Sequence, residues 1–189
     1  MIFQPKEITL KNGVKAILKT PEISDAAAML GYIKTSCGET EFLARYPEEW
    51  EGVTVEKEEK WVKNLRESKS TLAIACFIDD EIAGNCEISF KGGMKTSHRA
   101  TIAIAILQKY WNLGIGSAFF REMIAAAESQ ERIEIVELSF IEGNTRARAL
   151  YEKFGFRIVG SLPGVIKLKD GSYRDEYYMQ YRIKNDKLS

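Results

Sequence analysis

Residues 110–120 of the chain read YWNLGIGSAFF, and they place two glycines, Gly114 and Gly116, where a helix begins. A glycine in a helix costs about 1 kcal/mol relative to alanine, so the pair needs a reason. Glycine lets a phosphate come close to the unpaired N–H groups of a helix start. The alternative is tight packing between a strand and the helix. A dinucleotide-binding turn would have a third glycine where Phe119 stands, and a P-loop would have a lysine after the second glycine.

The composition favours one ordinary globular enzyme or binding domain. The chain has 189 residues, and Lys plus Arg and Asp plus Glu both total 27, which argues against a nucleic-acid partner. No stretch has the length and apolarity of a membrane span or a signal peptide, so we expect a cytoplasmic protein without a membrane partner. Cys37, Cys76 and Cys86 lack metal-ligand spacing, so we expect buried, reduced thiols and no metal site.

Hydrophobic periodicity predicts an α/β domain. Strands are expected over residues 14–19, 71–78, 81–90, 99–106, 133–141, 156–162 and 172–183. Helices are expected from Ser24 to about residue 36, from a Thr54 cap, from the glycine pair to about residue 130, and over residues 144–155. The charged runs at residues 47–51 and 56–60 are expected to be solvated surface.

The glycine stretch and a second motif together resemble the GCN5-related N-acetyltransferase family. The first motif lies in residues 104–119, where that family has Arg/Gln-x-x-Gly-x-Gly/Ala. The second lies in residues 142–156, EGNTRARALYEKFGF, and is matched by Asn144, Ala147, Leu150, Tyr151, Lys153, Gly155 and Phe156. One departure stands out: Trp111 occupies the position that is usually Arg or Gln.

The resemblance implies one domain over residues 1–189, with a mixed, mostly antiparallel twisted sheet. About four helices flank this sheet, and splayed central strands hold the cofactor. The implied cofactor is acetyl-CoA, with no metal. The implied cofactor-binding residues are Ile104, Ile106, Trp111, Asn112, Leu113, Gly114, Ile115, Gly116, Ser117, Asn144, Tyr151 and Lys153. Ile104 and Ile106 would act through their backbone amides, and Lys109 or Lys153 would supply the cation that the turn lacks.

The implied chemistry is acetyl transfer to an amine by direct attack in a ternary complex. Tyr151 is the expected acid for the departing thiolate, although a core aromatic would also fit its position. Asn144 would bind the cofactor or simply cap a helix. An amine is mostly protonated at neutral pH, so a base is needed; Glu87 is the first choice and Glu142 the second, and a solvated edge carboxylate explains either one as well.

The expected acceptor is the amine of a small molecule, and the expected assembly is a monomer or a homodimer. Two alternatives stay open at this point. One is an enzyme that acetylates protein N-termini or lysines. The other is a non-catalytic acyl-CoA-binding regulatory module of the same fold, which the Trp111 departure and the absence of an obvious base allow.

Overall fold

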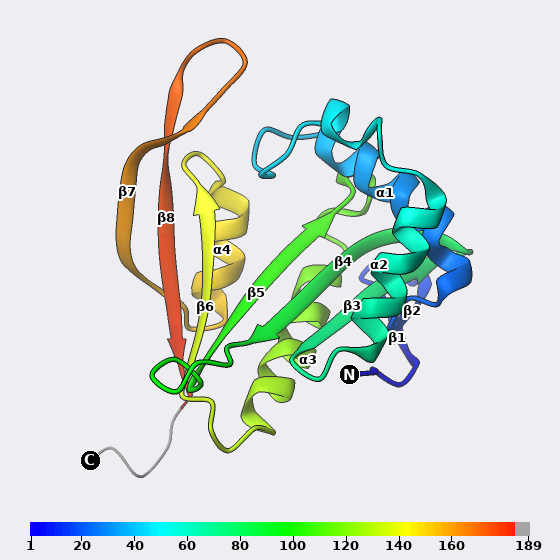
Figure 1. The fold of residues 1–189 in the computed structure, drawn as a ribbon, viewed down its shortest axis with the longest axis horizontal. Helices are drawn as coiled ribbons and strands as arrows, with labels where there is room; N and C mark the ends of the chain where they lie inside the picture. The colour runs from blue at the N-terminus through cyan, green and yellow to red at the C-terminus, as the bar shows by residue number, and fades with distance from the viewer. Residues whose placement is uncertain (184–189) are drawn as a thin grey trace. The chain divides into compact units, whose positions relative to one another are not determined.

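The computed structural model describes residues 1–183 of the chain. Twelve strands and α-helices follow one another (Figure 1): β1 Lys6–Thr9, β2 Lys15–Lys19, α1 Ala26–Gly38, α2 Val55–Glu67, β3 Thr71–Ile78, β4 Glu81–Phe90, β5 Arg99–Ile106, α3 Ile115–Glu128, β6 Ile135–Ile141, α4 Thr145–Lys153, β7 Arg157–Lys167 and β8 Tyr173–Arg182. Short 3-10 helices lie at Ile23–Asp25, Pro47–Trp50 and Gln108–Tyr110.

Hydrogen bonds join the strands in the order β1-β2-β3-β4-β5-β6-β8-β7. The β1–β2, β2–β3, β3–β4, β6–β8 and β7–β8 pairs are antiparallel, and the β5–β6 pair is parallel. With four α-helices in the described chain, this confirms the predicted α/β fold with a mixed, mostly antiparallel sheet. The β5–β6 register ends at Thr101↔Glu137. That these strands hold the cofactor remains a prediction.

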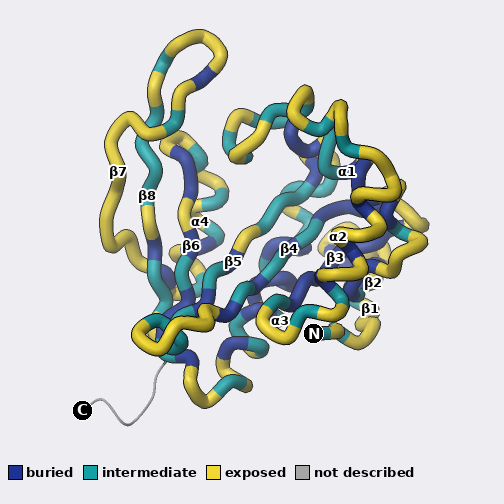
Figure 2. Tube along the Cα trace, viewed as in Figure 1, coloured by how far each residue is buried: buried dark blue, intermediate teal, exposed yellow. Residues whose placement is uncertain are grey.

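The chain forms two compact units, which share β5 and α3 between them. The first unit comprises Met1–Ser89 and Ala103–Phe119. Its core contains α1, β3 and β4 residues, and β3 is buried along nearly its whole length (Figure 2). The pattern of β3, TLAIACFI, has no polar alternation, as expected for a strand covered on both faces. One cluster of this core becomes important below: Met29, Tyr32, Ala75, Phe77, Ile82 and Leu107.

The second unit comprises Phe90–Ile102 and the chain from Phe120 onward. Aromatic rings from α3, β6, α4, β8 and the segment between α4 and β7 pack its interior. Phe120 lies 5.4 Å from Tyr151 and 5.2 Å from Phe154, measured between ring centroids. By contrast β7, which ends the strand order, is exposed over almost all of its residues (Figure 2).

The observed elements differ from the predicted ones at β1, at the start of α1 and at the end of β7. The strand β1 is not predicted, because four residues at a sheet edge give almost no periodic signal. Ser24 does not cap α1; it lies in a 3-10 turn, where the Asp25 carboxylate accepts a hydrogen bond from the Glu22 N–H at 2.8 Å. The strand at residues 156–162 extends to Lys167, because an edge strand tolerates Pro163 as a register irregularity.

Two local predictions are confirmed, the tight turn between β3 and β4 and the buried thiols. Asp79 and Asp80 both have positive φ, 47° and 65°, as the predicted tight turn between β3 and β4 requires. The three cysteines are free and buried. Among residues 1–183 no helix is long and apolar enough to cross a membrane.

Candidate active site

The turn before α3 has the backbone geometry that its glycines suggest. Asn112 and Gly114 have positive φ, 63° and 101°, and Gly114 therefore stands where a side chain would strain the backbone. The Ala118 N–H donates to the Gly114 carbonyl at 3.0 Å, which is the first hydrogen bond of the α3 ladder. The amides of the first turn of α3 thus precede that ladder, at the end of the helix where the macrodipole is positive.

Trp111 anchors this turn to the end of β5. Its indole N–H donates to the Ile106 carbonyl at 2.7 Å. The Lys11 N–H, just after β1, donates to the Leu113 carbonyl at 3.0 Å. The side chain that departs from the family pattern therefore holds the backbone of the turn in place. Neither hydrogen bond could be predicted from the sequence, because neither follows from helical or strand periodicity.

The outer half of β5 presents alternate amides to opposite edges. The Leu107 N–H donates to the Ala83 carbonyl of the strand β4 at 3.0 Å. Backbone N–H groups of a strand alternate in direction, so those of Ile104 and Ile106 point away from β4. These are the two amides that the family resemblance implies as cofactor contacts, and they lie beyond the point where the β5–β6 register ends.

Gly84 is a feature of this region that sequence reasoning missed. A Cβ at this position would lie 2.8 Å from the Ala105 carbonyl oxygen and 2.9 Å from the Ile106 side chain. No real side chain fits at such a distance, so glycine allows β4 and β5 to approach here. A lone glycine inside a strand pattern is the signal that could have indicated this.

The lysine expected to balance phosphate charge in the turn is already paired. The Lys109 Nζ lies 2.5 Å and 2.7 Å from the two carboxylate oxygens of Glu81, and the Tyr110 hydroxyl donates to the same carboxylate at 2.8 Å. The Lys109 hydrogen bond, followed by that of Tyr110, lowers the pKa of Glu81. Lys109 therefore brings no unbalanced charge to the turn.

In the second unit, the polar residue that opens α4 serves as its cap. The Asn144 Oδ1 accepts a hydrogen bond from the Ala147 N–H at 3.2 Å, which satisfies one of the unpaired donors of the helix start. Capping of α4 is therefore sufficient to explain an asparagine at position 144. Cofactor binding by Asn144 stays a prediction.

Tyr151 is held by rings rather than by hydrogen bonds. Only 6% of the residue is exposed, and its ring lies 5.4 Å from that of Phe120 and 6.1 Å from that of Phe140. Among residues 1–183 its hydroxyl has no hydrogen-bond partner. Burial raises the pKa of Tyr151 to about 12, so the hydroxyl keeps its proton at neutral and moderately alkaline pH. That state suits a proton donor and not a base.

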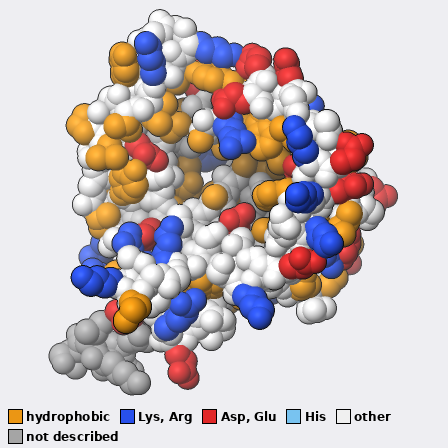
Figure 3. All heavy atoms as spheres, in the orientation of Figure 1, with side chains coloured by type: hydrophobic (Ala, Val, Ile, Leu, Met, Phe, Trp, Pro, Cys, Tyr) orange, Lys and Arg blue, Asp and Glu red, His pale blue; other side chains and the backbone are white. Residues whose placement is uncertain are grey.

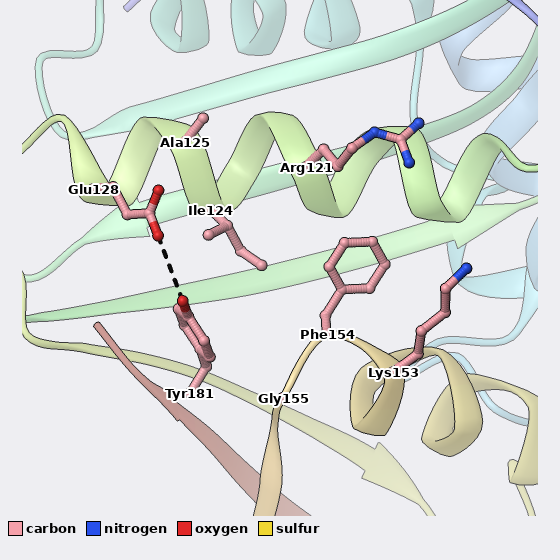
Figure 4. A pocket seen from close by; sticks show the side chains of 8 residues that line it. All are labelled: Arg121, Ile124, Ala125, Glu128, Lys153, Phe154, Gly155 and Tyr181. Carbon is pink, nitrogen blue, oxygen red and sulfur yellow. Dashed lines mark hydrogen bonds between the residues drawn. The ribbon is translucent and has the colours of Figure 1, made fainter. Parts of the chain in front are cut away.

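Lys153 lines a shallow pocket of the second unit (Figure 4). The pocket has a volume of about 490 Å³ and is lined by Arg121, Ile124, Ala125, Glu128, Lys153, Phe154, Gly155 and Tyr181. The Lys153 and Arg121 side chains bring positive charge to it. At the opposite end of the pocket, the Tyr181 hydroxyl lies 3.4 Å from the Glu128 carboxylate.

The two carboxylates considered as bases have different surroundings. Glu87 is half-buried on β4, where the Ser89 hydroxyl donates to its carboxylate at 2.8 Å. Glu142 is exposed in the second unit, and its carboxylate accepts a weak bond from the Asp175 N–H at 3.3 Å. Glu87 therefore has the environment in which a carboxylate is held in one orientation, and Glu142 is closer to a solvated edge residue.

One charged residue expected on the surface is buried, which corrects the interpretation of residues 56–60. Glu58 of α2 is only 3% exposed, and one of its carboxylate oxygens has no partner among residues 1–183. Burial raises the pKa of this carboxyl. Glu58 stands four and seven positions before the buried Val62 and Leu65, so all three share the inner face of α2. That spacing was visible in the sequence.

Surface charge agrees with the balanced composition. On the face drawn in Figure 3, Lys and Arg side chains are interspersed with Asp and Glu side chains. No group of three or more potential metal ligands occurs in the part of the chain that the structure describes.

Comparisons with known proteins bear directly on this arrangement. The sequence model of the acetyltransferase (GNAT) family matches residues 39–156, which include the glycine turn and the whole second motif. The L-amino acid N-acetyltransferase AaaT of Escherichia coli is 30% identical over 119 residues, which cover 63% of this chain and 73% of that protein.

Solved structures give the same picture of the fold. A GNAT-family acetyltransferase from Streptococcus pneumoniae is 26% identical and superposes with a TM-score of 0.81, over 89% of this chain and 99% of the other. A putative acetyltransferase from Salmonella typhimurium, solved with its cofactor acetyl-CoA, has a TM-score of 0.75 at 13% identity, over 91% and 96% of the two chains. At that identity the second likeness concerns the fold alone.

Proposed function

The chain belongs to the acetyltransferase (GNAT) family and is an N-acetyltransferase, and we propose that it transfers the acetyl group of acetyl-CoA to the amine of a small molecule. The observation that carries the cofactor assignment is the turn before α3. Gly114 has a φ of 101° in the family's glycine motif, directly before the amides that open the helix. Such a helix start binds phosphate through its N–H groups and its dipole.

The residues of the turn fit an anionic group without a basic side chain. Trp111, Asn112, Leu113, Gly114, Ile115, Gly116 and Ser117 would bind the pyrophosphate through backbone amides. The loss of the usual Arg or Gln matters less for such a site, since amides do not depend on the side chain. Lys153, which lines the pocket of the second unit, is the cation we assign to the cofactor.

Bound acetyl-CoA supplies a thioester, whose acyl carbon the amine attacks and whose sulfur leaves as a thiolate. The N–H groups of Ile104 and Ile106 would donate to the acyl oxygen, where negative charge develops. Tyr151 would give its hydroxyl proton to the sulfur, and its raised pKa keeps that proton available. Glu87 would accept the proton that the ammonium group loses, with Glu142 as the second choice.

For the acceptor we propose a free amino acid or a similarly small amine. The support is the similarity to AaaT, an L-amino acid N-acetyltransferase of which the chain covers 73%. This assignment distinguishes the chain from enzymes that acetylate protein N-termini or lysines.

A panel of amines assayed for CoA release tests the proposal. The panel should contain L-amino acids, aliphatic amines, and peptides with a free N-terminus or lysine, and mass spectrometry should identify the acetylated product. A thiol reagent suits this assay because all three cysteines of the chain are buried. We expect acetylation of at least one amino acid or small amine. Acetylation of peptides alone would contradict the acceptor class, and tight acetyl-CoA binding without any product would indicate a non-catalytic module.

A further inference from the structure

A tyrosine hydroxyl enters the hydrogen-bond ladder between β4 and β5. The bonds from Lys91 N–H to the Arg99 carbonyl and from Leu107 N–H to the Ala83 carbonyl set an antiparallel register that places Asn85 opposite Ala105. At this position the Asn85 N–H donates to the Tyr32 hydroxyl at 3.2 Å. The same hydroxyl lies 2.8 Å from the Ala105 carbonyl oxygen. Tyr32, from the helix α1, therefore connects the backbones of the two strands.

Packing holds Tyr32 in this place. The residue is 5% exposed, and its ring belongs to the core cluster with Met29, Phe77 and Leu107. Ala105 packs against the same cluster. Burial raises the pKa of the Tyr32 hydroxyl, so it is neutral and has one proton to donate at any working pH. That proton has two acceptors, the Ala105 carbonyl at 2.8 Å and the Asn85 side-chain oxygen at 2.9 Å.

The Ala105 carbonyl and the Ile106 N–H belong to one peptide group. A trans peptide is planar, and its C=O and N–H point in opposite directions. A donor on the Ala105 carbonyl therefore orients the Ile106 N–H away from β4. It also polarises the peptide, which makes that N–H a stronger donor.

The next peptide group is held as well. The Trp111 indole N–H donates to the Ile106 carbonyl at 2.7 Å, and the Leu107 N–H is bonded to the Ala83 carbonyl. Two consecutive peptides at the end of β5 thus have fixed orientations, and the first of them depends on a side chain from α1.

We propose that Tyr32 is a positioning residue for acetyl transfer, whose hydroxyl orients and polarises the Ala105–Ile106 peptide so that the Ile106 N–H donates to the acyl oxygen. The inference rests on the proposed function, since it concerns the same acyl site. Tyr32 itself touches neither substrate; it acts on the reaction through one backbone amide. A purely structural tyrosine would fill the cluster with its ring and leave the strength of that amide unchanged.

The variant Tyr32→Phe removes the hydroxyl and keeps the ring. Two measurements distinguish positioning from packing: kcat against the acetyl-CoA dissociation constant, and the infrared stretch of the carbonyl of carbon-13-labelled acetyl-CoA bound without acceptor. A hydrogen bond to the thioester carbonyl lowers its stretching frequency. We expect the bound frequency in Tyr32→Phe to move toward that of free acetyl-CoA and kcat to fall about tenfold, while the dissociation constant changes less than about threefold.

Tyr110→Phe is the matched control. Tyr110 packs against the same cluster, but its hydroxyl donates to Glu81 and not to β5. We expect both the frequency and kcat of Tyr110→Phe to equal those of the wild type. A folded Tyr32→Phe protein with wild-type kcat and wild-type carbonyl frequency would overturn the inference.

A second variant covers the case in which Tyr32→Phe does not fold. Asn85→Ala removes the acceptor that competes for the Tyr32 proton, so the Ala105 carbonyl should receive it fully and the bound carbonyl frequency should fall below that of the wild type. An unchanged frequency in Asn85→Ala would also overturn the inference. Failure of the proposed function looks different, because the wild type itself would then fail to bind acetyl-CoA or to lower its carbonyl frequency.

Discussion

The glycine turn of the first unit and the helix α4 of the second carry the two family motifs. In the proposed function the turn acts through backbone atoms, and α4 acts through a side chain. In the turn, Gly114 and its neighbours offer backbone amides, while the Trp111 side chain only anchors the loop to the Ile106 carbonyl. In α4, the proposed chemistry depends on one side-chain atom, the Tyr151 hydroxyl, and the ring serves the packing.

This proposed difference would account for the departure from the family pattern at the first motif and the match at the second. A backbone site requires a conformation, which several side chains can support, so Trp111 can stand where Arg or Gln is usual. A side-chain site requires one chemical group at one position. We therefore expect substitution of Tyr151 in α4 to affect turnover, and substitutions in the turn to affect cofactor affinity.

The largest expected effect is that of Tyr151→Phe. Loss of the proton donor should lower kcat about a hundredfold, with little change in acetyl-CoA affinity, because the lost interaction belongs to the transition state. Tyr177→Phe is the control, since Tyr177 stacks on Phe140 in the same aromatic cluster with its ring centroid 5.4 Å away. Equal turnover in Tyr151→Phe and wild type would assign the residue to the core alone.

The pH profile sharpens the same prediction. An acid must be protonated to act, and the pKa of Tyr151 is raised to about 12, so ionisation of Tyr151 should cause no fall of kcat between about pH 7 and about pH 10. A loss of kcat with an apparent pKa near 10 that disappears in Tyr151→Phe would show that burial does not protect this hydroxyl.

Gly114→Val should weaken acetyl-CoA binding by about tenfold or more, because a branched residue cannot keep a φ of 101° and the turn would have to change its backbone conformation. Gly171→Val is the matched control: Gly171 has a φ of 86° and open space around it, in the turn between β7 and β8. Both variants should lose similar free energy of unfolding, and only Gly114→Val should lose affinity in calorimetric titration. Equal acetyl-CoA affinities in Gly114→Val and Gly171→Val would show that Gly114 serves the packing of the turn and not cofactor binding.

Glu87→Gln should lower kcat/KM about fivefold at neutral pH and hardly at all once the amine is mostly deprotonated, because a free amine needs no base. The profile of kcat/KM against pH in the variant and in Glu142→Gln measures this. If only Glu142→Gln changes the profile, the base is Glu142 of the second unit. The side-chain chemistry would then belong to the second unit, and the first unit would contribute backbone amides.

The smallest effect is expected for Trp111→Phe. The variant loses the hydrogen bond to the Ile106 carbonyl, which should lower the free energy of unfolding by about 1 kcal/mol and acetyl-CoA affinity about threefold. Trp61→Phe on the exposed side of α2 is the control and should change neither. A loss of affinity in Trp111→Phe as large as in Gly114→Val would mean that the indole itself binds the cofactor.

The sequence alone determined the α/β class, most of the strands and helices, and the residues that carry both motifs. These depend on short-range patterns: the apolar run of β3, the alternation along β5, helical spacing in α3 and α4, and the glycine whose conformation the turn requires. Such patterns involve residues a few positions apart, and a single chain displays them directly. The same spacing rule would also have indicated the burial of Glu58, had it been applied to Glu58, Val62 and Leu65.

Only the tertiary structure decided which side chains hold the backbone of the proposed site. Tyr32 meets the Ala105 carbonyl across 73 positions of sequence, and Gly84 meets the same carbonyl from the neighbouring strand. Lys109 is one of the two lysines that the sequence offers as the cation of the turn, and it pairs with Glu81 across 28 positions. Such partners are chosen by the register of β4 against β5 and the packing of α1 on them. Local sequence does not encode that register, because any strand with the same alternation would pair as well.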